Sequence, residues 1–172
     1  PGFNVYAGIF DMGEKNGEQK YKWKKGTLTK NTSALDGTDI ITDQELSSLG
    51  VVNGNATLNI EGTTITGNVY GGGESSAATG NVNVNISGGT MTNVYGGGDE
   101  GAVGGNCVVT LSGSATVIGN VYGGGNEGDV CGNTYVNLGN GRIYDAFGGA
   151  CDADILGHTE VYIGRQPDGN GG

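Results

Sequence analysis

A six-residue phrase, Asn-Val-Tyr-Gly-Gly-Gly, occurs three times in this chain of 172 residues. The copies begin at Asn68, Asn93 and Asn120, so they are 25 and 27 residues apart. Related phrases begin at Asn4 and at Asp145. Repetition at a period of roughly 20 to 50 residues is typical of solenoids and other arrays in which each unit packs against its neighbours. We therefore divide the chain into five units, the first of which is interrupted by an insertion.

Each unit also contains a stretch in which apolar and polar residues alternate. The stretch begins at a glycine, and the second, fourth and sixth residues after it are mostly apolar, whereas the residues between them are mostly polar. Alternation with a period of two is typical of a strand with one buried face. The residues expected to point inward are Ala56, Leu58, Ile60, Val82, Val84, Ile86, Cys107, Val109, Leu111, Thr134, Val136, Leu138, Thr159, Val161 and Ile163.

A second, shorter strand is expected just before each phrase, around Ile65, Met91, Val117 and Ile143. The Asn or Asp that opens each phrase then marks a corner, because these residues tolerate the left-handed backbone that sharp turns use. The chain has 38 glycines. Those that follow each corner allow the chain to turn where side chains would collide.

An aromatic residue recurs two positions after each corner. If equivalent positions stack, Tyr70, Tyr95 and Tyr122 form a column that Phe147 continues and that Tyr6 would extend. The residue before each tyrosine is a valine, which competes with it for the interior, so the sequence leaves open which of the two faces inward. The competing valines are Val69, Val94 and Val121.

The absence of any helical periodicity between the repeats predicts an all-β fold. We expect a single-stranded, right-handed parallel β-helix, a solenoid of about five coils with an inserted cap or loop, in which each unit is one coil stacked about 4.8 Å from the next. A β-propeller blade needs about 40 to 45 residues, more than these units provide. The calcium-binding nonapeptide roll is excluded because its repeat is far shorter.

The whole chain is predicted to be one β-helix domain. In the insertion, residues 42–50 resemble a short helix with Thr42 as N-cap and Glu45 in the capping-box position. Residues 20–30 are expected to form a basic hairpin loop. The predicted boundaries are 1–10 plus 51–67 for the first coil, 11–50 for the insertion, 68–92, 93–119, 120–144 and 145–164 for the other coils, and 165–172 for a flexible tail.

Charge is distributed very unevenly along the chain. The formal net charge is −10, yet all six lysines lie within residues 15–30. An acidic body repels phosphate groups, so a nucleic-acid partner is not expected. No apolar run approaches the roughly 18 residues that would cross a bilayer, and no signal peptide or initiator Met is present, so we expect a piece of a longer chain with no membrane span.

The sequence Gly-Asn-Val-Asn-Val-Asn-Ile-Ser-Gly-Gly-Thr-Met-Thr-Asn-Val-Tyr-Gly-Gly-Gly, at residues 80–98, resembles the Gly-rich β-helix repeats of large adhesin-like surface or secreted proteins of gut bacteria. The resemblance covers residues 51–164 and does not include the insertion. It implies an extracellular or bacterial cell-surface location and a right-handed β-helix inside a long multidomain chain. It brings no catalytic residues, and the site motifs of pectate lyases and polygalacturonases, which share the general architecture, are absent.

The loop after each phrase is acidic, and stacked loops would form a ridge along one edge. Such a ridge could hold calcium, which takes six to eight oxygen ligands. The simpler alternative is a solvated edge that keeps the protein soluble. Asp99 and Glu127 could also lie within the roughly 5 to 9 Å that glycoside hydrolysis requires, but any stacked carboxylates would do so. The candidate metal ligands are Asp99, Glu100, Glu127, Asp129, Asp152 and Asp154, with Glu74 at the start of the ridge.

A basic and aromatic cluster in the insertion is the main candidate for binding outside the coils. Trp23 lies among Lys22, Lys24 and Lys25. This combination suits an anionic glycan, a membrane surface or the acidic ridge of another molecule. In the alternative interpretation Trp23 anchors the insertion to the end of the solenoid and the lysines are simply solvated. The rings of the tyrosine column are a second candidate, as surfaces for sugars.

The cysteines and the single histidine admit structural explanations. Cys107 occupies an inward position and is expected to be a small core residue. Cys131 and Cys151 fall in loops of adjacent coils, where a disulfide is one of two outcomes that the sequence leaves open. His158 occupies the position that Asn133 and its equivalents hold in the other coils.

These observations favour a non-catalytic structural and binding module of a bacterial cell-surface or secreted adhesin-like protein, with no required cofactor. The partners expected are a glycan or a surface protein and the other domains of the same long chain. A polysaccharide-binding or polysaccharide-degrading protein that uses the acidic loops is the first alternative. The second is an element that associates end to end into fibres, because exposed strand edges invite pairing.

Overall fold

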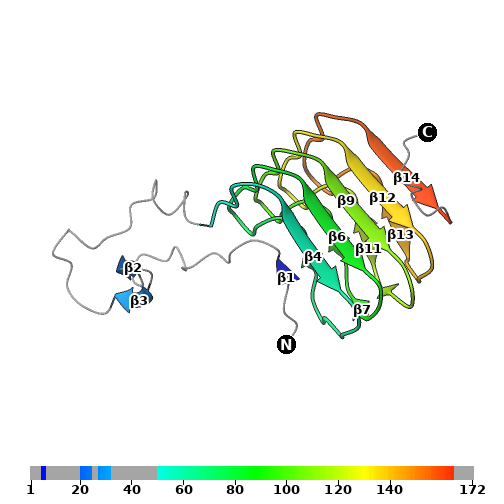
Figure 1. The fold of residues 1–172 in the computed structure, drawn as a ribbon, viewed down its shortest axis with the longest axis horizontal. Helices are drawn as coiled ribbons and strands as arrows, with labels where there is room; N and C mark the ends of the chain where they lie inside the picture. Colours follow the sequence, from blue (N-terminus) through cyan, green and yellow to red (C-terminus); the bar gives the residue numbers. More distant parts are fainter. Residues whose placement is uncertain (1–4, 7–19, 25–26, 32–49, 165–172) are drawn as a thin grey trace.

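The computed structural model describes residues 5–6, 20–24, 27–31 and 50–164. Every regular element in these residues is a β-strand (Figure 1). None of them forms a helix long and apolar enough to span a membrane. The strands are β1 (Val5–Tyr6), β2 (Lys20–Lys24), β3 (Thr27–Asn31), β4 (Ala56–Ile60), β5 (Val69–Tyr70), β6 (Val82–Ile86), β7 (Thr90–Met91), β8 (Val94–Tyr95), β9 (Cys107–Leu111), β10 (Thr116–Val117), β11 (Asn120–Tyr122), β12 (Thr134–Leu138), β13 (Asp145–Phe147) and β14 (Thr159–Ile163).

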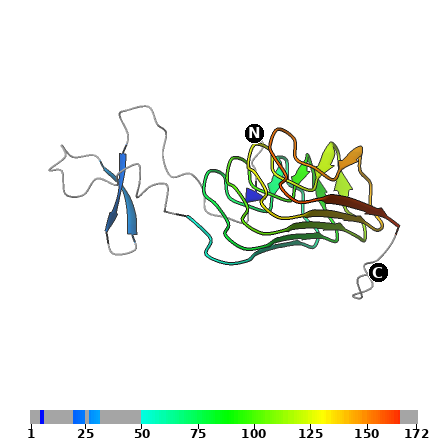
Figure 2. The same cartoon turned by 90° about the horizontal axis from the view of Figure 1, so that it is seen from above.

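The strands form a parallel β-solenoid, which confirms the predicted fold class. One five-stranded sheet has the order β4-β6-β9-β12-β14 and the other has the order β1-β5-β8-β11-β13. Figure 2 shows these two sheets facing each other across the core. Neighbouring strands pair in parallel with the repeats in register, so that Val82 is opposite Cys107, and Cys107 is opposite Thr134. Residues that are equivalent in the sequence alignment of the repeats therefore stack on one another in the structure.

The core is a set of apolar columns between the sheets. The inward residues of β6, β9 and β12 are fully or almost fully buried, as the alternation predicted. Burying an aliphatic side chain of this size contributes roughly 1.5 to 3 kcal/mol. Thr134 is a fully buried polar residue in these columns, and its hydroxyl donates a hydrogen bond to the carbonyl oxygen of Gly148. The buried polar group is thereby satisfied.

The valines of the repeated phrase, and not the tyrosines, face the interior. Val69, Val94 and Val121 have no exposed surface and belong to the core cluster. Successive side chains of a strand point to opposite faces. The tyrosine column therefore lies on the other face of its sheet, which answers the question that the sequence left open.

The predicted short strands before each phrase are present as β7 and β10, extended by single bridges at Thr64 and Arg142. A further column, which the sequence analysis missed, consists of one bridging residue in each coil. Ala78, Val103 and Val130 are its buried members. A single apolar residue is too short to produce an alternating pattern.

The second glycine of the phrase is needed because neighbouring coils approach closely there. A Cβ atom on Gly97 would lie 2.7 Å from the amide nitrogen of Gly125 and 2.9 Å from its Cα. Real Cβ atoms essentially never make contacts this short. At the corresponding glycine of the last coil, Gly149, a Cβ would meet nothing within 4 Å. The requirement for glycine therefore comes from the coil above.

Part of the predicted insertion is described. β2 and β3 pair in antiparallel orientation, with Trp23 opposite Leu28, which confirms the hairpin. The helix predicted over residues 42–50 falls outside the described residues except for Gly50.

Candidate functional site

An asparagine row along one edge of the β4-to-β14 sheet holds the coils together. The side-chain oxygens of Asn55, Asn81 and Asn106 each accept a hydrogen bond, 2.8 Å long, from the backbone N–H of the equivalent residue in the next coil. Asn133 makes the same bond, at 3.0 Å, to the N–H of His158. His158 thus takes the last position of the row, as predicted, and its backbone N–H donates the last hydrogen bond of the row.

A second asparagine row lies at the corner of the repeated phrase. Asn93 donates its side-chain N–H to the side-chain oxygen of Asn68 at 3.0 Å, and its own oxygen accepts the backbone N–H of Asn120 at 2.8 Å. The side-chain amide of Asn120 also donates to the hydroxyl of Tyr122 at 3.0 Å. This corner row is thereby linked to the tyrosine column.

The predicted aromatic column exists, and its rings stack on one another. The ring centroids of Tyr70 and Tyr95, Tyr95 and Tyr122, and Tyr122 and Phe147 are 4.8, 5.0 and 5.1 Å apart. The ring planes are within 14° of parallel. Both faces of Tyr95 and Tyr122 are therefore covered by neighbouring rings. Tyr70 and Tyr95 are buried and Tyr122 is half-buried, so of these four residues only Phe147, at the end of the column, is exposed.

Burial is the largest of the causes that raise the pKa of Tyr95 from 10.0 to about 12, and the nearby Cys151, Tyr122 and Asp99 contribute in the same direction. The hydroxyl of Tyr95 therefore stays neutral at every physiological pH. A neutral phenol in a packed column fits structural support better than proton transfer.

The acidic residues after each phrase do not converge on one point. Backbone hydrogen bonds from Asp99 to Gly73 and from Asn126 to Gly98 place Asp99 and Asn126 in one column. The side-chain amide of Asn126 donates to the Asp99 carboxylate at 2.9 Å. Asp99 therefore faces an amide in the next coil, and Glu127 belongs to the neighbouring column.

The other acidic candidates fall into two further columns. Glu100, Glu127 and Asp152 stack in successive coils, because Glu127 bonds to the carbonyl of Asp99 and Asp152 to that of Asn126. Asp129 accepts the backbone N–H of Asp154 at 3.0 Å. Among the described residues, no group of three or more His, Cys, Asp or Glu side chains is arranged to hold a metal ion. Calcium binding at this edge stays a prediction.

The disulfide that the sequence left open is not formed. Cys131 and Cys151 are both free and exposed. Leu156 bonds to the carbonyl of Val130, which places it beside Cys131, whereas Cys151 bonds to Gly125 and lies beside Asn126. The two cysteines therefore occupy different columns of the solenoid. Cys107 is a buried core residue, as predicted, and burial raises its pKa from 9.0 to about 12.

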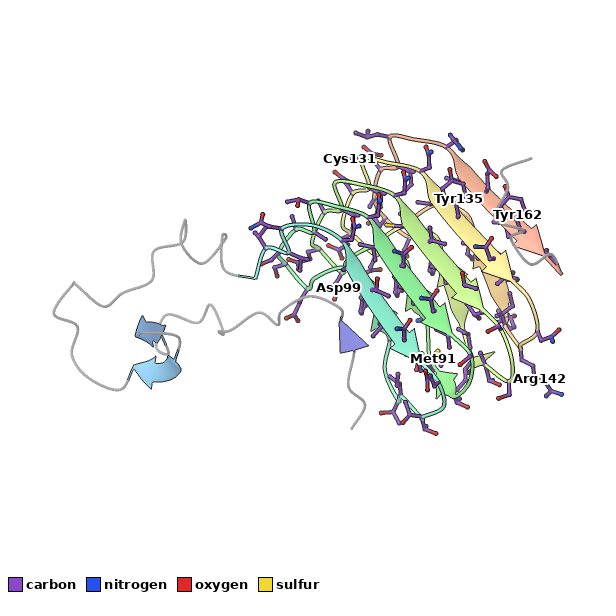
Figure 3. All side chains as sticks on the ribbon, in the orientation of Figure 1. Met91, Asp99, Cys131, Tyr135, Arg142 and Tyr162 are labelled. Atoms are coloured by element: carbon purple, nitrogen blue, oxygen red, sulfur yellow. The ribbon has the colours of Figure 1, made fainter. Side chains whose placement is uncertain are left out.

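The outward face of β12 and β14 carries a cluster that the sequence analysis missed. Tyr162 donates its hydroxyl to the Glu160 carboxylate, whose other oxygen lies 3.2 Å from Nε2 of His158. The His158 ring meets Tyr135 edge to face, with centroids 6.1 Å apart. Figure 3 shows Tyr135 and Tyr162 on these neighbouring strands. We call Tyr135, His158, Glu160 and Tyr162 the tyrosine cluster.

The equivalent outward rows of the first three coils contain Thr, Asn and Val. Asn85 donates to Asn59 at 2.9 Å, so the outward face begins as an amide ladder. The tyrosine cluster begins where this pattern stops. Asking where the outward residues depart from the repeat would have located it from the sequence alone.

The basic cluster is described only in part. Lys22, Trp23 and Lys24 lie in β2, and Lys25 falls outside the described residues. Binding through these residues stays a prediction. No protein-family model, curated protein or solved structure matches this chain.

Proposed function

We propose that this chain is a non-catalytic structural and binding module of a bacterial cell-surface or secreted adhesin-like protein. The observation that carries the proposal is the use of the repeated polar residues. The side-chain oxygens of Asn81, Asn106 and their equivalents accept hydrogen bonds from the backbone of the next coil. Residues repeated in every coil therefore serve cohesion along the axis, as expected of a stalk or scaffold.

The binding part of the proposal rests on the outward face of the β4-to-β14 sheet. Five adjacent strands form a face about 19 Å wide at the usual strand spacing of about 4.8 Å. Asn and Thr side chains supply hydrogen-bonding groups, and the tyrosine cluster adds two half-exposed aromatic residues. Tyrosine combines a large contact area with a polar hydroxyl and few rotatable bonds. We assign an extended carbohydrate chain as the ligand class, because such a chain presents both hydroxyl groups and apolar ring faces.

A glycan array tests this proposal. The wild-type chain should bind one class of polysaccharide, and Tyr135→Ala and Tyr162→Ala should each weaken that binding about 10-fold or more, as expected for the loss of about 1.4 kcal/mol or more of contact energy. Ile118→Ala is the control, because Ile118 is 66% exposed and lies outside the strands of this sheet.

Two outcomes would contradict the proposal. Binding that all three variants retain would place the ligand elsewhere, and a chain that binds no glycan would leave only the structural role. Repeating the array with calcium and with a chelator tests the acidic ridge separately, since the tyrosine cluster requires no metal.

A further inference from the structure

Two asparagines among residues 50–164 are followed directly by glycine, and both lie in exposed connections between strands. They are Asn53 and Asn140. In an Asn-Gly pair the backbone nitrogen of the glycine can attack the side-chain carbonyl carbon of the asparagine, because glycine has no Cβ to obstruct the approach. The other asparagines of this segment precede residues with a side chain, which hinders that approach. These two pairs are therefore the places in the described solenoid where the attack is sterically open.

The backbone around Asn53 is held by Thr79 of the next coil. The Gly54 N–H donates a hydrogen bond to the Thr79 hydroxyl at 3.0 Å, and this hydroxyl donates in turn to the Val52 carbonyl oxygen at 3.3 Å. The backbone N–H of Thr79 also donates to that carbonyl oxygen, at 2.9 Å. The bond to Thr79 restrains the rotation that would bring the Gly54 nitrogen to the Asn53 side chain, so the attack must first break it.

The backbone around Asn140 has no such clamp. The N–H groups of Gly139 and Arg142 donate to carbonyl oxygens of the preceding coil, at 2.9 and 2.8 Å. Between these two bonds, the structure describes no hydrogen bond from the Gly141 N–H to any of its described residues. The nitrogen that would attack the Asn140 side chain is therefore free to turn.

The exposure of Asn140 is a property of the turn in which it lies. Gly113 and Ser114, in the corresponding turn of the preceding coil, are also exposed, although a further coil stacks on them. Asn140 and Gly141 are exposed in the same way, so water reaches the Asn140 side chain.

We propose that Asn140 is a site of spontaneous deamidation, whereas Thr79 protects Asn53 from the same reaction. The Gly141 nitrogen forms a bond to Cγ of Asn140, the bond from Cγ to Nδ2 breaks, and ammonia leaves with the proton of the Gly141 nitrogen. The product is a cyclic imide. Water then adds to one of its two carbonyl carbons and opens the ring to aspartate or isoaspartate. The net reaction consumes one water and releases one ammonia, without oxidation or reduction.

The reaction changes both the charge and the backbone of this corner, which connects β12 to β13. It adds one negative charge close to Arg142, the one Lys or Arg among residues 50–164. Isoaspartate also carries the main chain through the former side chain, which lengthens the segment between the bonds that fix Gly139 and Arg142. The corner would therefore change with the age of the protein. This inference does not depend on the proposed glycan binding.

Peptide mapping by mass spectrometry tests the proposal on the full chain, incubated at physiological temperature and pH. Asn140 should deamidate at least about 5-fold faster than Asn53, the ratio expected when the Gly54 nitrogen must first lose a hydrogen bond of about 1 kcal/mol. Mapping assigns the change to each asparagine, so Asn16 and Asn170, which also precede glycine but lie outside the described residues, do not enter the comparison.

The same chain unfolded in guanidinium chloride is the control for local sequence. Unfolding removes the Thr79 contact, so the ratio of the two rates should fall toward one. An equal ratio in the native and the unfolded chain would overturn the proposal, and so would an Asn140 that stays intact in the native chain.

Two substitutions of Thr79 test the protection directly. Thr79→Val removes the acceptor but keeps the shape, and should speed the deamidation of Asn53 about 5-fold. Asn140 in the same molecule is the internal control and should keep its rate. Thr79→Ser retains the hydroxyl and should retain the slow rate of Asn53. Both variants should keep the wild-type circular dichroism spectrum, because Thr79 is exposed. Equal Asn53 rates in the wild type and in Thr79→Val would refute the protective role of Thr79.

Discussion

Replacing Gly97 by Ala should destabilise the solenoid because the coil above leaves no room for a methyl group. The added Cβ would lie 2.7 Å from the Gly125 nitrogen, 2.9 Å from its Cα and 3.1 Å from the Gly124 carbonyl carbon. All three atoms belong to the backbone, so the clash cannot be relieved by a side-chain rotation. The coils must separate locally, which weakens the hydrogen bond from the Gly97 N–H to the Gly124 oxygen.

The magnitude follows from these two effects. Overpacking costs about 1 to 3 kcal/mol, and a weakened backbone hydrogen bond adds about 1 kcal/mol. For a chain of this length, a total of about 2 to 4 kcal/mol corresponds to a decrease in melting temperature of about 5 to 15 °C. Gly149→Ala, at the same position of the last coil, meets nothing within 4 Å and should change the melting temperature by less than about 2 °C.

Thermal unfolding followed by circular dichroism measures both variants. If Gly97→Ala and Gly149→Ala melt at the same temperature, close approach of neighbouring coils is not the reason for the glycine, and the reasoning is wrong.

Two further predictions concern the cohesion of the coils and the buried thiol. Asn106→Ala should lower the free energy of unfolding in urea by about 1 to 2 kcal/mol, because the Asn133 N–H loses its acceptor, and Asn106→Asp should cost less because it keeps an oxygen there. In the native chain, Ellman's reagent should react rapidly with Cys131 and Cys151 only; a rapid third thiol would contradict the burial of Cys107. The folded-state pKa of Cys107 is raised from 9.0 to about 12, so its contribution to stability is complete below pH 9 and is lost as the pH rises toward 12. Between pH 8 and pH 10 the wild type should therefore lose about 1 kcal/mol more than Cys107→Val, and equal losses in urea titrations would refute this assignment.

Much of the fold could be predicted because the repeat specifies its own contacts. In a parallel in-register stack, equivalent residues of successive units are neighbours, so aligning the repeats places Val84 beside Val109 and Tyr70 beside Tyr95. The same reasoning identified His158 as the end of the asparagine row. These predictions needed no knowledge of three-dimensional geometry beyond the period.

The alignment of the acidic loops could also have been predicted from the sequence. The acidic loops have equal lengths, and Asp99, Asn126 and Cys151 each directly follow their phrase. Counting from the phrase would therefore have paired Asp99 with Asn126, as the structure does. Cys131 is the sixth residue after its phrase and Cys151 is the first after its own, so the same count would have placed them in different columns.

The tyrosine cluster illustrates a limit of this counting. Its members depart from the Thr, Asn and Val of the earlier coils, but this departure does not show which of them touch. Only the pairing of β12 with β14 brings Tyr135 and His158 into contact.

The sequence by itself determined the period, the inward columns and the parallel stacking, since alternating residues repeated at nearly constant intervals can bury their apolar faces only against copies of themselves. Tertiary structure decided which residue of the phrase packs in the core cluster between the sheets and which outward side chains touch across neighbouring strands. These outcomes depend on how the side chains of both sheets pack together, which no single repeat shows. Val94 and Tyr95 are neighbours in the sequence and both are buried, but Val94 packs in the core cluster between the two sheets, whereas Tyr95 stacks in the aromatic column on the other face.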